Sequence, residues 1–298
     1  MSETSPRRLD EHLPRIRREL SGASRLLVCL DFDGTLAPIV EEPTDAAALE
    51  ANERGLETLA SEPQVSTAIV SGRALSDVRT RVGGADVYAG NHGLELERDG
   101  SVAVHPIART RAALVDEVCS ALETVLEPIP RTRIENKRLT GTVHTRSVPA
   151  ALRPVVGRLA ERIVDRIGGG DLVLSSGKRV LEVGPAIPWG KGNAVELIAS
   201  DLPAETASVY VGDDVTDESA FQAVEPAGIG VRVGDSRPSA ASYRVRSPEH
   251  VAEFLEWLDS EVLDAIGRPI DPGSDTLVTT AAGSPAPIER RSSSQADD

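Results

Sequence analysis

Residues 25–36 read RLLVCLDFDGTL, and this stretch decides the fold that we expect. Its first half, residues 25–30, is a short apolar run of the kind that forms a strand buried on both faces of a parallel sheet. The run ends at two carboxylates placed two positions apart, Asp31 and Asp33. At a strand end, the first can attack a phosphorus atom as a nucleophile, and the second can protonate the leaving group and later accept a proton from water. The stretch therefore predicts a phosphoryl-transfer site at the carboxyl end of a core strand.

Two simpler motifs also place acidic residues around a glycine. A solvated Asx turn would put them beside Gly34, but such a six-residue pattern arises by chance in roughly one protein in thousands. An EF-hand loop does not fit, because Gly34 stands at its fourth position instead of the sixth and no third ligand stands at its fifth position. We expect Gly34 to allow a tight turn and Thr35 to offer its hydroxyl to a phosphate or to the turn itself.

The same arrangement recurs twice along the chain. Residues 65–70 are apolar and run into Ser71, and residues 207–211 are apolar and lead to Asp213. A helical pattern follows each apolar run, at residues 46–60, 74–82 and 217–224. This alternation predicts an α/β fold with a doubly wound, Rossmann-like parallel sheet. Ligands bind such sheets at the carboxyl edge, where these polar residues stand.

The pattern changes between about residues 94 and 183, where helical periodicity at 106–126 and 149–167 alternates with five strand-like stretches. This change predicts an α+β unit inserted into the sheet domain. Ser247 and Pro248 predict the start of a last helix, as its N-cap and first residue. We expect an N-terminal helix within residues 1–22, a core domain at 23–92 and 185–262, an inserted cap at 93–184, and a disordered tail at 263–298.

Composition excludes several function classes. The formal net charge of −15 repels nucleic acid and anionic membranes, which carry phosphates of the same sign. No apolar run is long enough to span a bilayer, and the N-terminus lacks the apolar segment of a signal peptide. The two cysteines, Cys29 and Cys119, lie among apolar residues and are expected to pack without pairing. We therefore expect a cytoplasmic protein.

Lysine is scarce, since only Lys137, Lys178 and Lys191 occur among 32 basic residues. An acidic, lysine-poor surface is expected of a protein kept soluble in concentrated salt. High-GC codon bias, which favours arginine, accounts for the composition equally well. In either case each lysine is a candidate for a role that needs a compact ammonium group.

Four motifs in order resemble those of the haloacid dehalogenase superfamily of phosphatases. They are centred on Asp31 and Asp33, on Ser71, on Lys191 within PWGKG, and on Asp213 within GDDVTDE. The resemblance implies that Ser71 binds the phosphoryl group and that Lys191 neutralises charge on the nucleophile. It also implies Mg²⁺ bound by Asp31, the backbone carbonyl of Asp33, and Asp213. Supporting roles are left open for Thr35, Asp214 and Asp217. The last two, together with Glu218, can position Lys191, position a metal-bound water, or cap the next helix.

Further segments are NHG at residues 91–93, ENKR at 135–138, HTR at 144–146 and GKRVLEV at 177–183. Together with GDDVTDE they resemble trehalose-6-phosphate phosphatases specifically, and the resemblance covers about residues 24–258. The resemblance implies that charged groups of the cap grip the sugar. The residues assigned to substrate binding on this basis are Gly72, Arg73, Asn91, His92, Glu135, Lys137, Arg146, Lys178 and Glu182. Carboxylate and ammonium groups suit sugar hydroxyls, because each hydroxyl both donates and accepts hydrogen bonds. Without the resemblance, a solvated strand face would account for the cap residues equally well.

The resemblance implies Mg²⁺-dependent hydrolysis of trehalose 6-phosphate through an aspartyl-phosphate intermediate, with a trehalose-6-phosphate synthase as a functional partner. The alternatives are another capped sugar phosphatase, acting on sucrose phosphate, mannosyl-phosphoglycerate or a hexose phosphate, and a non-catalytic domain that binds sugar phosphate and regulates a synthase. The non-catalytic alternative predicts decay of the motifs, whereas Asp31, Asp33, Ser71, Lys191 and Asp213 are all present.

Overall fold

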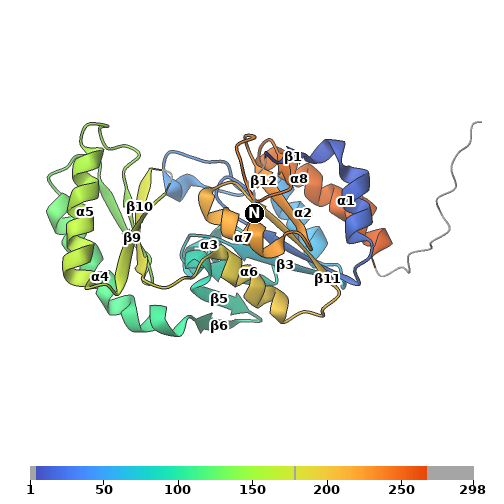
Figure 1. The fold of residues 1–298 in the computed structure, drawn as a ribbon, viewed down its shortest axis with the longest axis horizontal. Helices are drawn as coiled ribbons and strands as arrows, with labels where there is room; N and C mark the ends of the chain where they lie inside the picture. The colour runs from blue at the N-terminus through green and yellow to red at the C-terminus, as the bar shows by residue number, and fades with distance from the viewer. Residues whose placement is uncertain (1–4, 178, 267–298) are drawn as a thin grey trace, which may run out of the picture. The chain divides into compact units, whose positions relative to one another are not determined.

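The computed structural model describes residues 5–177 and 179–266, and within them a nine-stranded sheet forms the larger part of the fold (Figure 1). Its strands, in order across the sheet, are β1 (Arg7–Arg8), β13 (Tyr243–Val245), β12 (Ile229–Val233), β11 (Thr206–Gly212), β2 (Arg25–Leu30), β3 (Val65–Val70), β4 (Val87–Gly90), β5 (Glu95–Arg98) and β6 (Ser101–Val104). Neighbours pair in parallel from β1 to β4, whereas the pairs β4–β5 and β5–β6 are antiparallel. The expected α/β fold with a mostly parallel sheet is confirmed.

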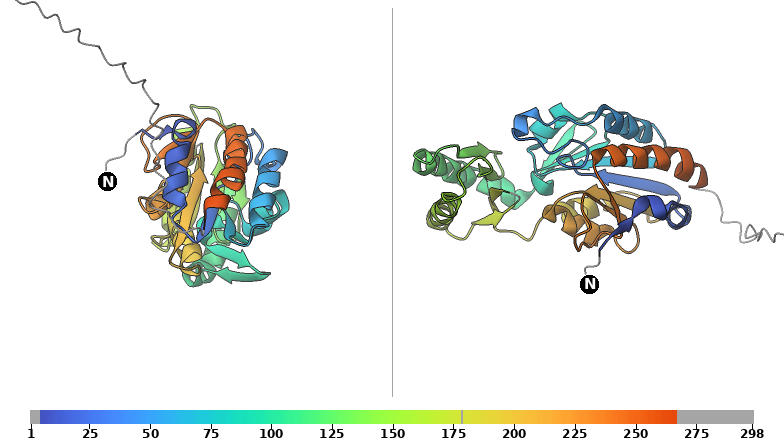
Figure 2. Two further views of the ribbon diagram at one scale, coloured as in Figure 1. Left: turned by 90° about the vertical axis from the view of Figure 1, so that its right-hand side faces the viewer. Right: turned by 90° about the horizontal axis from the view of Figure 1, so that it is seen from above.

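Helices cover both faces of this sheet because its central strands are apolar on both sides (Figure 2). Along β2, Leu26, Val28 and Leu30 join one hydrophobic cluster, and Leu27 and Cys29 join the other. The first cluster is completed by α1 (Leu13–Leu20), α2 (Glu50–Ala60), α3 (Leu75–Arg81) and α8 (Pro248–Trp257). The second is completed by α6 (Lys191–Ser200) and α7 (Glu218–Val224). This packing holds the strand ends, and the polar residues on them, in fixed positions.

A second, four-stranded antiparallel sheet is built from the inserted part of the chain, within the residues that the structure describes. Its strands, in order across the sheet, are β7 (Arg133–Asn136), β8 (Gly141–His144), β10 (Val180–Pro185) and β9 (Leu172–Ser176). The helices α4 (Pro106–Leu126) and α5 (Arg153–Gly168) pack on it around a third hydrophobic cluster. We call α4 to β10, residues 106–185, the small-sheet unit.

The limits of this unit bear on the domain division expected from the sequence. The strands β5 and β6, at residues 95–104, pair with the large sheet. This strand pairing favours a boundary between core and cap after β6 instead of at residue 93. Residues 258–265 form a π-helical turn (η5, Leu258–Val262) and a 3₁₀ turn (η6, Leu263–Ala265). The helical structure therefore continues past residue 263, where the tail was expected, and residues 267–298 lie outside the described part. The division into core and cap domains stays a prediction.

Most elements expected from the sequence are present with small shifts. The apolar runs at 25–30 and 65–70 are strands with those bounds, and the first helix is a 3₁₀ turn (η1, Leu9–Glu11) followed by α1. The strands β4, β12 and β13 were not expected, because their runs are short or contain arginine and glycine. Both cysteines are buried and unpaired. No helix in the described residues has the length and apolar character that crossing a bilayer requires.

Candidate active site

Three neighbouring strands end together at the site. Asp31 directly follows β2, Ser71 follows β3 and Asp213 follows β11, and β2 lies between the other two in parallel register. Lys191 is the first residue of α6 and approaches the same edge. The four motifs, of which the first and last lie more than 180 residues apart in the sequence, thus meet at the carboxyl edge of the large sheet.

Lys191 joins two carboxylates in the buried centre of the site. Its Nζ lies 2.8 Å from Oδ1 of Asp31 and 2.7 Å from Oδ1 of Asp217. Burial alone would lower the pKa of Lys191, but the two carboxylates raise it above its usual range, so the side chain stays an ammonium ion. The position that the sequence assigned to charge neutralisation is occupied by a fixed positive charge in direct contact with Asp31.

Asp217 is held by more partners than the sequence indicated. It is fully buried, and its Oδ1 also accepts a hydrogen bond from the hydroxyl of Tyr210 at 2.6 Å. Its Oδ2 accepts one from the backbone N–H of Asp214 at 2.8 Å, which closes the turn that carries both residues. Asp217 therefore contacts Lys191 directly, and its role in positioning that lysine, one of three roles considered from the sequence, stays a prediction. Tyr210 was not predicted, although a tyrosine in a buried strand needs a hydrogen-bond partner.

The acidic residues around Asp31 form an oxygen-rich cluster that fits a small divalent cation. Carboxylate oxygens of Asp31, Asp213 and Asp217 all lie within 4.8 Å of one another. Burial raises the pKa of Asp31, and the charges of Asp217 and Asp213 raise it further. Gly34 has a φ of +83°, and a Cβ there would stand 2.4 Å from Cγ of Asp213, so only glycine allows this approach. Mg²⁺ prefers such carboxylate oxygens, and a cation would offset the repulsion among them.

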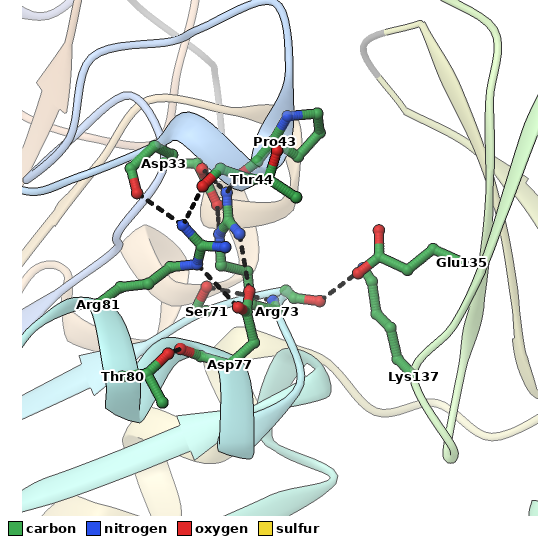
Figure 3. A network of polar contacts seen from close by, with 12 residues as sticks. Asp33, Pro43, Thr44, Ser71, Arg73, Asp77, Thr80, Arg81, Glu135 and Lys137 are labelled. Atoms are coloured by element: carbon green, nitrogen blue, oxygen red, sulfur yellow. Dashed lines mark hydrogen bonds and ion pairs between the residues drawn. The ribbon is translucent and has the colours of Figure 1, made fainter. Parts of the chain in front are cut away.

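Asp33 is bound by Arg73 (Figure 3). Arg73 donates from Nε to Oδ2 and from Nη2 to Oδ1 of Asp33, and its Nη1 donates to Asp77 at 2.7 Å. A further bond runs from Nη2 to the carbonyl oxygen of Pro43 at 2.9 Å. Burial alone would lower the pKa of Arg73, but Asp33 and Asp77 raise it. The guanidinium, which was expected to bind substrate, is thus already engaged by protein groups.

Two hydroxyls expected near the phosphoryl group are buried. Ser71 has no exposed surface, and its Oγ accepts a hydrogen bond from the backbone N–H of Arg73 at 3.2 Å. Thr35 is also fully buried, and its Oγ1 has no hydrogen-bond partner among the described residues. Neither residue lines the cavity described next. Their assignment to phosphoryl binding stays a prediction.

A cavity of about 640 Å³ opens over Asp31, between the strand ends and the small-sheet unit. Asp31, Asp33, Lys191, Asp213 and Asp214 line one part of it. The residues assigned to substrate binding that line it are Gly72, Arg73, His92, Glu135, Lys137, Arg146 and Glu182. The volume lies in the range that holds a small-molecule ligand. One cavity is therefore lined both by Asp31 and Asp213 of the acidic cluster and by most of the residues that the sequence assigned to substrate binding.

The small-sheet unit lines the cavity with two carboxylates, each of which is paired with a histidine. Glu182 lies 3.2 Å from Nε2 of His92 and 3.7 Å from Nζ of Lys137. Burial raises the pKa of Glu182, but the hydrogen bond and charge of His92, with Lys137, lower it to about 2. Glu135 accepts a hydrogen bond from His144 at 2.7 Å, which lowers the pKa of Glu135 to about 2. Both carboxylates are therefore charged at neutral pH, and His144 is a lining residue that the assigned set lacked.

Other assigned residues hold the small-sheet unit against the rest of the chain. Lys137 donates to the carbonyl oxygen of Gly72 at 2.9 Å, and Arg146 donates to that of Val40 at 2.9 Å. Asn91 is fully buried outside the cavity, where it bonds to Glu95 and Thr140. In the structure Asn91 thus bonds to protein groups outside the cavity, although it was assigned to substrate binding. Lys178 lies outside the described residues.

Comparison with known proteins places these features in one family. The model of the trehalose-phosphatase family matches residues 29–249. A trehalose-phosphate phosphatase of Mycobacterium ulcerans is 37% identical over 250 residues, which cover 80% of this chain and 62% of that protein. A trehalose-phosphate phosphatase of Mycobacterium tuberculosis is 34% identical over 278 residues, covering 88% and 69%. The chain thus spans about three-fifths of the length of the former.

Solved structures share the fold. The C-terminal domain of C. albicans trehalose-6-phosphate phosphatase superposes with a TM-score of 0.72 and 23% identity, covering 87% of this chain and 99% of that domain. A sucrose-phosphatase from Synechocystis has a TM-score of 0.50 and 18% identity, covering 78% and 96%. At these identities the similarity shows the architecture alone.

Proposed function

The chain belongs to the trehalose-phosphatase family, and from this we propose that it hydrolyses trehalose 6-phosphate to trehalose and phosphate. The observation that carries the proposal is the cavity over Asp31, which combines an acidic, lysine-bearing floor with a charged wall from the small-sheet unit. A phosphate monoester needs the first feature, and a disaccharide rich in hydroxyls needs the second. A trehalose-6-phosphate synthase is the expected functional partner, because such an enzyme makes the substrate.

Asp31 is the proposed nucleophile. Its carboxylate oxygen forms a bond to phosphorus while the bond between phosphorus and the sugar oxygen breaks, which gives an aspartyl phosphate. Asp33 donates a proton to the departing sugar oxygen, then accepts one from the water that attacks the aspartyl phosphate. Arg73 binds both oxygens of Asp33. The Asp33 carboxylate therefore has to give up one hydrogen bond to Arg73 before it can reach the departing sugar oxygen or the attacking water.

Charge at the reacting centre is balanced by groups already in place. Lys191 lies 2.8 Å from Asp31 and offsets the repulsion between that carboxylate and a phosphate dianion. Asp31, Asp213 and the backbone carbonyl of Asp33 would hold Mg²⁺, which when bound supplies further positive charge to the transferring oxygens. Glu135, Lys137 and Glu182 would bind sugar hydroxyls and select the substrate.

The test is phosphate release by the purified chain from a panel of trehalose 6-phosphate, sucrose 6-phosphate, mannosyl-phosphoglycerate and glucose 6-phosphate. We expect the highest kcat/KM for trehalose 6-phosphate, loss of turnover in EDTA, and its return with Mg²⁺ but not Ca²⁺, which imposes looser coordination. A preference for another sugar phosphate would keep the phosphatase and discard trehalose. Full turnover in metal-free buffer would overturn the metal assignment, and no release from any ester would overturn the proposed function.

A further inference from the structure

Arg232 is a buried charged residue near the site that no sequence motif indicated. It lies in β12 with only 2% of its surface exposed, among apolar neighbours in the stretch Ile229–Val233. In the parallel register of β11 and β12 it stands opposite Gly212, the residue that directly precedes Asp213. Its side chain therefore starts beside the first residue of the acidic loop, which we define as residues 212–218.

The guanidinium of Arg232 contacts both ends of the acidic loop. Its Nη2 donates to the carbonyl oxygen of Asp213 at 2.9 Å, and its Nη1 donates to Oε1 of Glu218 at 2.9 Å. Glu218 is fixed in turn, because the hydroxyl of Ser239 donates to its Oε1 at 2.8 Å and the N–H of Ala240 to its Oε2 at 2.7 Å. One side chain thus fastens the two ends of the loop that carries Asp213 and Asp217.

A gain in the stability of the folded protein does not explain the buried ion pair between Arg232 and Glu218. Removing a guanidinium and a carboxylate from water is costly, and apolar residues of similar volume often stabilise a protein equally well or better. Within the described residues Nε of Arg232 has no hydrogen-bond partner, which adds to the cost. The planar guanidinium of Arg232 bonds to two groups at once and so fixes the distance between the Asp213 carbonyl and Glu218. An apolar residue cannot do this.

We propose that Arg232 is a positioning residue for the metal site: it orders the acidic loop before the cation binds, so that the Asp213 carboxylate stands beside Asp31. Mg²⁺ demands near-ideal octahedral geometry, so a displaced carboxylate lowers its affinity. Partners that orient a metal ligand typically account for roughly 10–100-fold in metal affinity. The inference rests on the proposed function, because it needs the Mg²⁺ site.

The test measures Mg²⁺ binding directly, by isothermal titration calorimetry of the metal-free full chain without substrate. In Arg232→Lys the charge beside Glu218 remains, but one ammonium cannot reproduce the fork between two groups. We expect the dissociation constant for Mg²⁺ to rise about 10–100-fold, while kcat at saturating Mg²⁺ falls much less. Arg244→Lys is the matched control, since Arg244 stands at the same register on the neighbouring strand and has no hydrogen bond to the acidic loop in the described structure.

The double variant Arg232→Met/Glu218→Gln guards against misfolding, because it leaves no unpaired buried charge, and it should show the same loss of Mg²⁺ affinity. Unchanged Mg²⁺ affinity in both Arg232 variants, with normal binding by the wild type, would overturn this inference alone. Equal losses in Arg244→Lys, or unfolding of both Arg232 variants, would reduce Arg232 to a structural residue and overturn it as well. Absence of Mg²⁺ binding by the wild type would overturn the metal site, and this inference with it.

Discussion

Arg73 donates two hydrogen bonds to Asp33, from Nε to Oδ2 and from Nη2 to Oδ1, each 2.7 Å long. The same guanidinium bonds to Asp77 and to the carbonyl oxygen of Pro43, and it lies 5.3 Å from the centre of the Phe32 ring. The proposed acid and base of the reaction is therefore held by a residue that the sequence assigned to substrate binding.

We predict that Arg73→Lys lowers kcat for trehalose 6-phosphate by about 10–100-fold and changes KM much less. A lysine keeps the charge but cannot bind both oxygens of Asp33, and a small misplacement of a reacting group can cost a hundredfold in rate. Steady-state kinetics would measure this split. Arg81→Lys is the control, because Arg81 bonds to Asp77 at 2.8 Å without contacting Asp33. A rise in KM with kcat unchanged would return Arg73 to substrate binding.

Asp31→Asn should abolish turnover, because an amide cannot attack phosphorus. The side chain keeps its shape, so circular dichroism and the melting temperature should show a folded protein. Asp33→Asn should lower kcat by roughly 10²–10⁴-fold through loss of proton transfer. Phosphate release by Asp31→Asn at more than a few per cent of the wild-type rate would be incompatible with an aspartyl phosphate on Asp31.

Glu135→Ala and Glu182→Ala should each lower kcat/KM for trehalose 6-phosphate by about tenfold or more, the loss expected for a hydrogen bond to a charged group. Both variants should hydrolyse p-nitrophenyl phosphate nearly as well as the wild type, because that ester is too short to reach the wall of the cavity. Glu161→Ala, an exposed change on α5, is the control. Equal losses on both esters would indicate a damaged fold instead of lost recognition.

Stability in acid should depend on Glu135, whose pKa is lowered from 4.5 to about 2, chiefly by the hydrogen bond from His144. A carboxylate with a lowered folded pKa stabilises the protein fully above its unfolded pKa, and this contribution is lost as the pH falls from 4.5 towards 2. Urea unfolding across this range should show a smaller loss of unfolding free energy in Glu135→Gln than in the wild type. An identical acid response in the two proteins would mean that the bond to His144 adds no stability.

Much of the fold follows from local pattern. Residues 25–30 and 65–70 are strands with the expected bounds, because a strand buried on both faces is a continuous apolar run that ends where its polar loop starts. The pattern failed for β12 and β13. In both strands an arginine interrupts a short apolar run, and only the packing of neighbouring strands makes that position a strand.

The sequence by itself predicted the central strands β2, β3 and β11, the helices that follow them, and the identity of the residues at the carboxyl edge of the first sheet. Asp31, Lys191 and Asp213 meet as expected, since parallel strands end at a common edge. Tertiary structure alone decided that Arg73 binds Asp33, that Asn91 is buried outside the cavity, and that Arg232 fastens the acidic loop. Those contacts depend on strand register and on which distant segments pack together, and register is set by pairing across the whole sheet, which no local stretch of sequence encodes.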